Sequence, residues 1–157
     1  MKTKLGNSIL GLFLLVAAFS ASAAVAELKP VKLPKPVTSG GMPLMEALAK
    51  RSTSRSFSGK ELSPQMLSNL LWAAFGINRP DGKRTAPSAM NWQEISIYVA
   101  TKDGVYLYDA AGNVLQPGAD GDQRAKTGMQ QQAAQSPVSL IFVADFGKTK
   151  QVQKDDK

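Results

Sequence analysis

The stretch Lys50-Arg51-Ser52-Thr53-Ser54-Arg55-Ser56-Phe57 decides how the rest of this sequence is interpreted. It carries four hydroxyls and three cations, and no carboxylate follows until Glu61. Arginine can donate to two oxygens of one phosphate at once, so these residue types in so short a span suit a phosphate group. The alternative is a solvated polar loop that leaves a helix, which is the usual role of a run of charges.

A second polar stretch, Thr85-Ala86-Pro87-Ser88-Ala89-Met90-Asn91-Trp92-Gln93, lies further along the chain, just before a pattern typical of a strand. Together the two stretches resemble the nitroreductase family of flavin-dependent oxidoreductases. The first fits the pattern R-[RHS]-[ST]-x-[RK]-x-[FY], called the first motif below, at Arg51, Ser52, Thr53, Arg55 and Phe57. The second fits P-S-x-x-N-x-Q, called the second motif below, at Pro87, Ser88, Asn91 and Gln93. Residues 70–79 and 84–89 look most like the branch related to SagB-type dehydrogenases.

The resemblance implies that the protein binds FMN at a homodimer interface. Residues of the first motif would hold the phosphate, the ribityl chain and the pyrimidine edge: Arg51, Ser52, Thr53 and Arg55. Residues of the second motif would reach the flavin of the other subunit: Pro87, Ser88 and Asn91. Many relatives have a second serine where this chain has Ala89, so one hydrogen bond to the flavin would be missing. A further family position that donates to the flavin falls among residues 129–132.

The family's chemistry takes place on the flavin, so the resemblance implies no catalytic side chain. Flavin N5 accepts and returns a hydride, while the protein positions the ring and tunes it. The implied reaction is reduction, by NAD(P)H, of a small-molecule acceptor such as a nitroaromatic compound or a quinone. In SagB-like relatives the reaction is instead oxidation of an azoline ring.

Two alternatives of other classes stay open at this point. One is a non-enzymatic periplasmic module that binds anions through basic residues: Arg51, Arg55, Lys60, Lys83 and Arg84. The other is an inactive fragment, because relatives continue beyond this length with further helices, a Gly-rich strand near the flavin and a late basic residue at the phosphate. We therefore expect a nitroreductase-like domain that is truncated at its C-terminus.

Composition limits the class of protein. The chain has 157 residues, a one-domain length, and its 43% hydrophobic and 20% charged residues are typical of a globular fold. It contains no cysteine and no histidine, which excludes thiol chemistry, Cys or His metal sites and His-based triads. The formal charge of +7 suits an anionic ligand. The basic residues form no continuous stripe and no nucleic-acid-binding module, so no nucleic-acid partner is expected.

Residues 1–26 have the pattern of a secretory signal peptide. Lys2 and Lys4 form the positive start, residues 9–19 are apolar, and two small-residue cleavage patterns follow, the second ending at Ala26. The apolar run is shorter than the ~20 residues that a membrane span needs. We therefore expect cleavage, export to a bacterial periplasm, no membrane association afterwards, and a mature net charge lowered from +7 to +5.

The pattern as a whole predicts an α+β domain in which helices flank a mixed, mainly antiparallel sheet. Residues 43–146 would form the N-terminal part of a nitroreductase-like domain. Residues 27–42 are rich in proline, which predicts an extended arm or linker before that domain. Residues 147–157 would follow it as a polar tail.

Two helices are expected in the first half of the domain. Pro43 begins a short one that ends near Lys50. Ser63 and Pro64 provide the cap and the first turn of a second helix, which Gly76 ends. The aromatic residues of the second helix are expected to pack in the core rather than to bind a ligand: Trp72 and Phe75.

Strands and turns are expected in the second half. Alternating apolar residues at 95–100 and 105–108 predict a hairpin around Lys102-Asp103-Gly104. A short strand is expected at residues 114–115, followed by a loop at residues 116–121.

The last two predicted elements are a helix and a strand. Residues 122–134 predict a weakly amphipathic helix with Ala125 and Met129 facing inward. Residues 138–144 are apolar throughout, which predicts a central strand covered on both faces. Few partners are visible to flank such a strand, so another chain or a further segment would have to cover it.

Overall fold

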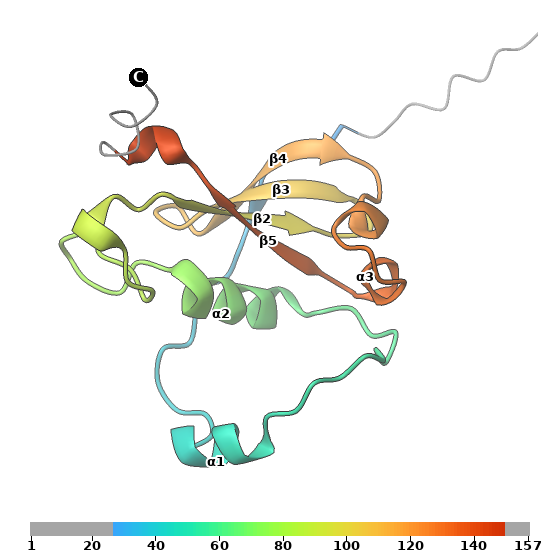
Figure 1. The fold of residues 1–157 in the computed structure, drawn as a ribbon, viewed down its shortest axis with the longest axis horizontal. Coiled ribbons are helices and arrows are strands. Elements are labelled where there is room, and N and C mark those ends of the chain that lie inside the picture. The colour runs from blue at the N-terminus through green and yellow to red at the C-terminus, as the bar shows by residue number, and fades with distance from the viewer. Residues whose placement is uncertain (1–26, 150–157) are drawn as a thin grey trace, which may run out of the picture.

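The structure, a computed structural model, describes residues 27–149 of the chain. The predicted signal peptide and residues 150–157 of the predicted tail lie outside the described residues. The described chain forms a five-stranded sheet in the order β1-β4-β3-β2-β5, with helix α2 along one face (Figure 1). The strands are β1 Val31–Lys32, β2 Ile95–Ala100, β3 Gly104–Asp109, β4 Val114–Asp120 and β5 Ser139–Ala144. The helices are α1 Leu44–Lys50, α2 Pro64–Phe75 and α3 Gln132–Gln135, with 3-10 turns η1 Ala89–Asn91, η2 Arg124–Lys126 and η3 Phe146–Lys148. These elements confirm the α+β class, and each described strand pairing is antiparallel.

The hairpin of β2 and β3 forms where the alternating pattern predicted it. Ile97 and Val99 are buried, while the residues between them on β2 point to the other face. Thr101 Oγ1 closes the turn by accepting hydrogen bonds from the backbone N–H groups of Asp103 at 3.2 Å and Gly104 at 3.3 Å. A side chain at position 104 would meet the carbonyl oxygen of Ala119 in β4, so the glycine allows the strands to approach.

Helix α2 covers one face of the sheet and supplies much of the core. Ser63 Oγ accepts a hydrogen bond from Met66 N at 3.2 Å, and Pro64 begins the helix, as predicted. Three buried residues of α2 pack against the inward side chains of β2 and β3: Leu67, Leu71 and Phe75. Trp72 Nε1 donates to the carbonyl oxygen of Ile77 at 3.1 Å. Phe75 therefore packs in the core as predicted, whereas Trp72 is half-buried beside it and its role stays a prediction.

The proline-rich arm adds a strand to the sheet. Its strand β1 pairs with β4, and Leu33, which follows β1, is buried in the core. Ser68 Oγ in α2 donates to the carbonyl oxygen of Pro34 at 2.6 Å. Asn113 Nδ2, in the turn before β4, donates to the same carbonyl at 2.8 Å. These bonds fix the arm to both α2 and the sheet.

Strand β4 is longer than expected, so the predicted loop at residues 116–121 is wrong. The strand continues to Asp120 because β3 pairs with it as far as the pair Gly104↔Asp120. Proline and glycine in this stretch suggested a loop. Pro117 nevertheless pairs with Tyr106 of β3, at a position beyond the two-residue pairing with β1, and proline is tolerated at such edge positions. A shift in register after Val105 accommodates the extra residue on β4.

The helix predicted at residues 122–134 is also wrong, because only η2 and the four-residue α3 form there. Arg124 turns back on Asp122, with Nε donating to Oδ1 at 2.9 Å and Nη2 to Oδ2 at 2.7 Å. Its Nη1 donates to the carbonyl oxygen of Ser136 at 2.7 Å, which folds the segment into a loop before β5.

This segment has no apolar stripe to support a helix. Ala125 and Met129, which were expected to face inward, are both exposed. Gly128 between them disfavours a helix interior by about 1 kcal/mol relative to alanine. Local hydrogen bonds therefore decide the conformation instead of burial.

Strand β5 lies at the edge of the sheet, so the central strand predicted at residues 138–144 is wrong. β2 pairs with it along its whole length, and no strand within residues 27–149 pairs with its other edge. Phe142 and Val143 are 56% and 42% exposed. The apolar run thus reflects strand propensity and one-sided packing rather than cover on both faces.

Candidate functional site

The first motif lies in an exposed segment between α1 and α2, away from the sheet (Figure 1). Helix α1 ends where the motif begins, with Arg51 N donating to the carbonyl oxygen of Leu48 at 3.3 Å. Within residues 27–149 the motif's one side-chain hydrogen bond runs from Ser54 Oγ to the carbonyl oxygen of Ser56, at 3.0 Å. The cationic donors of the motif are therefore turned to solvent.

Helix α1 exposes an apolar face that nothing in residues 27–149 covers. Leu44, Met45 and Leu48 are 72%, 75% and 56% exposed, and the helix has no buried residue. An ion pair between Lys50 and Glu46, at 2.6 Å, adds only a few tenths of a kcal/mol to such a helix. A seven-residue helix is too short to be stable alone in water, so α1 requires a packing partner.

The second motif lies in the loop after α2, where its side chains bind one another. Ser88 Oγ donates to Glu94 Oε2 at 2.8 Å and accepts from Gln93 N at 2.8 Å. Gln93 Nε2 donates to the carbonyl oxygen of Gly82 and to Asn91 Oδ1, each at 3.2 Å. Hydrogen bonds from the Glu94 backbone and then from Ser88 hold the pKa of Glu94 below its usual value.

Three residues of this loop have left-handed backbone conformations. The φ angles of Met90, Asn91 and Gln93 are 51°, 56° and 48°. Such conformations cost about 1–3 kcal/mol each in non-glycine residues and cluster at functional sites. The hydrogen bonds of the second motif therefore hold the loop in a shape that the backbone alone disfavours.

Arg84 ties this loop to the end of α2. Its guanidinium lies over the Phe75 ring, 4.6 Å from the centroid, and its Nη1 donates to the Phe75 carbonyl oxygen at 2.9 Å. Its Nε donates to Gln93 Oε1 at 2.9 Å. The neighbouring Lys83 pairs with Asp81 at 2.8 Å. Two cations that the sequence offered as anion ligands are thus already engaged within the loop.

A hollow of about 320 Å³ lies beside the second motif. Its lining includes two basic residues, Arg79 and Lys83, and three polar residues of the motif: Ser88, Asn91 and Gln93. Small-molecule sites commonly enclose about 300–1,000 Å³. This hollow is at the lower end of that range, so it fits one part of a cofactor-sized ligand rather than the whole.

The two motifs lie at opposite ends of α2. The first precedes the helix and the second follows it, and twelve residues of helix extend about 18 Å. In Figure 1 the segment after α1 leads into the start of α2, and the loop with η1 leaves from its other end. One copy of the described chain therefore does not bring the motifs together.

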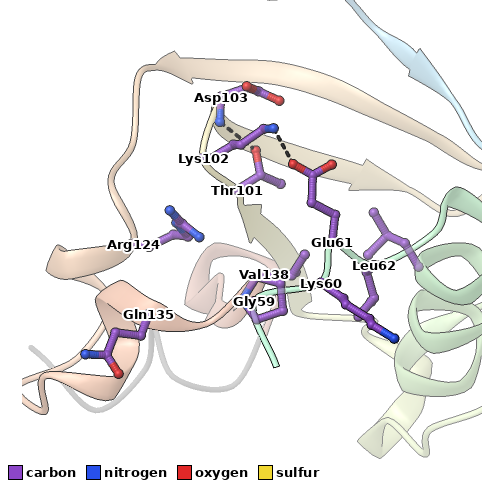
Figure 2. A pocket seen from close by; sticks show the side chains of 12 residues that line it. Gly59, Lys60, Glu61, Leu62, Thr101, Lys102, Asp103, Arg124, Gln135 and Val138 are labelled. Carbon is purple, nitrogen blue, oxygen red and sulfur yellow. Dashed lines mark hydrogen bonds and ion pairs between the residues drawn. The ribbon is translucent and has the colours of Figure 1, made fainter. Parts of the chain in front are cut away.

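A second hollow, of about 310 Å³, opens between the segment before α2, the β2–β3 turn and the residues just before β5 (Figure 2). Lys102 Nζ binds Glu61 across it, and the hydrogen bond from Lys102 lowers the pKa of Glu61. Arg124 at its rim binds Asp122 and lowers the pKa of that carboxyl to about 2. Within each pair the two charges neutralise one another. The hollow contains no residue of either motif.

The described part of the chain has neither a membrane-spanning helix nor a cluster of metal ligands. No helix of residues 27–149 has both the length and the hydropathy that crossing a membrane requires. Nor do three metal-ligating side chains gather anywhere in these residues. Of the residues expected to include a late flavin contact, 129–131 lie in the turn between η2 and α3, and Gln132 begins α3.

The chain belongs to the nitroreductase family, because a family model described as "Nitroreductase family" matches residues 48–157. A Methanocaldococcus jannaschii protein named "Putative nitroreductase MJ1384" is 30% identical over 122 residues, which cover 71% of this chain and 62% of that protein. The crystal structure of "a putative nitroreductase" from Ralstonia eutropha matches with a TM-score of 0.73 and 38% identity, over 81% of this chain and 60% of that one. This chain therefore spans about three fifths of the length of both relatives.

These matches confirm the family and the fold, while the roles of single residues stay predictions. The structure gathers three of the predicted contacts in one loop: Pro87, Ser88 and Asn91. It holds the other four apart from them: Arg51, Ser52, Thr53 and Arg55. The sequence analysis did not predict the hydrogen bond from Ser88 to Glu94. The position of Glu94, beside the motif and directly before β2, was the available signal. The bond from Arg84 to Gln93 was not predicted either.

Proposed function

We propose that the protein is an FMN-dependent oxidoreductase in which two copies of the chain build each flavin site. Membership of the nitroreductase family supports the oxidoreductase class. The flavin, when bound, supplies hydride transfer at N5, and the side chains bind, orient and shield it. The observation that carries the proposal is the separation of the two motifs by α2.

The first motif fits the anionic end of the cofactor. Arg51 and Arg55 offer guanidinium forks that match pairs of phosphate oxygens, and Ser52 and Thr53 add hydroxyl donors. Within residues 27–149 these four side chains have no hydrogen-bond partner of their own, and every one of them is exposed. Their donors are therefore available to a ligand.

The second motif fits the ring end. Pro87 presents an exposed apolar surface beside the hollow. The hydroxyl of Ser88 donates its hydrogen bond to Glu94 and accepts one from Gln93 N, which leaves one lone pair for a donor on the ligand. Asn91 is exposed and carries amide groups at the same hollow.

We propose a homodimer in which the first motif of one copy meets the second motif of the other. The uncovered apolar face of α1, directly before the first motif, supports a packing partner at this position. Burial of about 25 cal/mol per Å² of apolar surface would stabilise that contact. In a two-fold dimer the same pair of surfaces is used twice, giving two equivalent sites.

The electron donor and acceptor are proposals drawn from the family. NAD(P)H would reduce the flavin, and a nitroaromatic compound, a quinone or a similar small molecule would oxidise it. The SagB-like pattern of residues 84–89 supports azoline oxidation as a second reaction for the same site. The signal-peptide pattern of residues 1–26 supports a periplasmic or secreted location.

The test is whether the purified protein holds flavin. The expected sample is yellow, releases about one FMN per chain on denaturation and oxidises NAD(P)H in the presence of a quinone. A colourless protein that takes up no added FMN would contradict the proposal. Binding of inorganic phosphate by such a colourless protein would instead support the anion-binding module, for which the exposed Arg51 and Arg55 are the favourable observation.

A further inference from the structure

We infer that Gln93 and Arg84 are positioning residues that turn the amide of Asn91 so that its NH₂ group faces the ligand. The orientation rests on the hydrogen bonds of the loop, and the identity of the ligand as FMN rests on the proposed function. The consequence is a site that offers a donor, and so selects a ligand atom that accepts a hydrogen bond.

The orientation starts at Arg84, because a guanidinium only donates hydrogen bonds. Its Nε lies 2.9 Å from the side chain of Gln93, and only the amide oxygen of glutamine accepts. Gln93 Oε1 must therefore face Arg84. The guanidinium is itself held by the carbonyl oxygen and the ring of Phe75, so the orientation originates at the end of α2.

Gln93 passes this orientation on to Asn91. With Oε1 toward Arg84, the Nε2 group faces the opposite way, where it lies 3.2 Å from the carbonyl oxygen of Gly82 and 3.2 Å from Asn91. An NH₂ group requires acceptors, so the atom of Asn91 that meets it is Oδ1.

The NH₂ group of Asn91 then takes no part in the hydrogen bonds of the loop. Its Oδ1 is occupied by Gln93, and within residues 27–149 its Nδ2 has no hydrogen-bond partner. The residue is exposed, lines the hollow of about 320 Å³ and has a left-handed backbone with φ of 56°. At the edge of the hollow, Asn91 therefore keeps two N–H donors that no residue of 27–149 uses.

The chemistry of the ligand atom follows from this orientation. A carbonyl oxygen or an unprotonated ring nitrogen would accept from Asn91 Nδ2, whereas a ring N–H would not. Ser88 offers the opposite capacity, because its hydroxyl already donates to Glu94 and can only accept from a ligand. The loop therefore brings a donor and an acceptor to the lining of one hollow, as recognition of a heterocycle with alternating C=O and N–H groups requires.

The variant Gln93→Glu tests this arrangement. Glutamate keeps an oxygen for Arg84 but has no donor for Asn91, so the asparagine amide should turn over and present Oδ1 to the ligand. The Kd for FMN should rise about tenfold or more, because a hydrogen bond is replaced by two facing acceptors. Gln116→Glu, at an exposed position of β4, adds the same charge elsewhere and should change the Kd less than about twofold.

Two further measurements separate orientation from general loop stability. The first is the NMR signal of the Asn91 side-chain amide, assigned by its loss in Asn91→Ala: its hydrogen exchange should slow when Gln93→Glu provides an acceptor. The second is the double variant. If Gln93 acts through Asn91, Gln93→Glu should not weaken FMN binding further in an Asn91→Ala background.

The outcomes distinguish this inference from the proposed function. If the wild-type chain binds FMN and Gln93→Glu binds it equally well, the inference is overturned. An equal further loss in the Asn91→Ala background overturns it too, because it shows a merely structural role for Gln93. If the wild-type chain binds no FMN, the proposed function fails, and the amide exchange alone decides the orientation: unchanged exchange in Gln93→Glu overturns it, and slowed exchange supports it.

Discussion

Arg51 is the single residue whose loss should most weaken cofactor binding. Replacement by alanine removes a charge-assisted hydrogen bond to phosphate worth about 1.5–3 kcal/mol, so the affinity for FMN should fall about tenfold or more. Ser54→Ala is the matched control, because Ser54 occupies the variable position of the motif and already donates to Ser56. Flavin fluorescence titrations compare the two variants. Equal losses would show that the motif is wrongly assigned.

Leu71 is the residue whose loss should cost the fold most. It is fully buried between α2 and the sheet, and Leu71→Ala should lower the free energy of unfolding by about 2–5 kcal/mol through lost burial and a residual cavity. Leu70→Ala, on the exposed side of the same helix, should cost far less. Urea denaturation of both variants measures the difference. Similar costs would mean that α2 does not pack as described.

For single residues, the sequence pattern located the second motif but not the hydrogen bonds within it. Its pattern named Ser88, Asn91 and Gln93, yet gave no indication that Ser88 binds Glu94 or that Arg84 binds Gln93. Those contacts depend on the left-handed backbone of the loop, which places side chains several residues apart within 3 Å of one another. No periodic pattern encodes such a conformation.

Among the elements, those with strong local signals were predictable. The Ser-Pro start and apolar spacing of α2 and the alternation of β2 and β3 agree with the structure, because capping and burial act within a few residues. The segment after β4 was not predictable. There Arg124 binds Asp122 and Ser136, and these bonds outweigh a weak helical pattern. The position of β5 at the edge depends on strand order, which apolar residues alone do not specify.

The pair of Asp122 and Arg124 predicts how the loop before β5 responds to acid. The hydrogen bond from Arg124 lowers the pKa of Asp122 from 3.8 to about 2 in the folded chain. A folded pKa below the unfolded one means that the pair stabilises the fold fully above pH 3.8 and loses this contribution as the pH falls toward 2. Asp122→Asn should therefore melt below the wild type at pH 7, with a difference in Tm that shrinks toward pH 2. A constant difference across this range would contradict the assignment.

The outer edge of β5 predicts the association behaviour of the chain. Its six residues carry no charge, proline or glycine, and Phe142 is 56% exposed, which together make an edge that can pair with other strands. Phe142→Lys should reduce large aggregates at a given concentration, measured by light scattering. Met66→Lys, which replaces an exposed apolar residue of α2 by the same charge, should not. Equal aggregation of Phe142→Lys and the wild type would show that this edge is not the surface involved.

For the whole molecule, the fold leaves the two motifs apart and two apolar surfaces uncovered. Helix α1 exposes Leu44, Met45 and Leu48, and strand β5 exposes Phe142 and Val143. The family match and the position of α1 beside the first motif favour α1 as the contact with a second copy. On this account the flavin site belongs to the dimer, and each copy contributes a different half of it.

A mixed dimer tests that claim most directly. One chain carries Arg51→Ala and Arg55→Ala, its partner carries Asn91→Ala, and two affinity tags isolate the dimer that contains both. If each site combines the first motif of one copy with the second motif of the other, one site is intact and the other has lost both halves. The mixed dimer should then bind about one FMN per two chains with wild-type affinity, although each variant alone binds weakly. A mixed dimer with no site of wild-type affinity would show that each chain builds its own site, and would contradict the account.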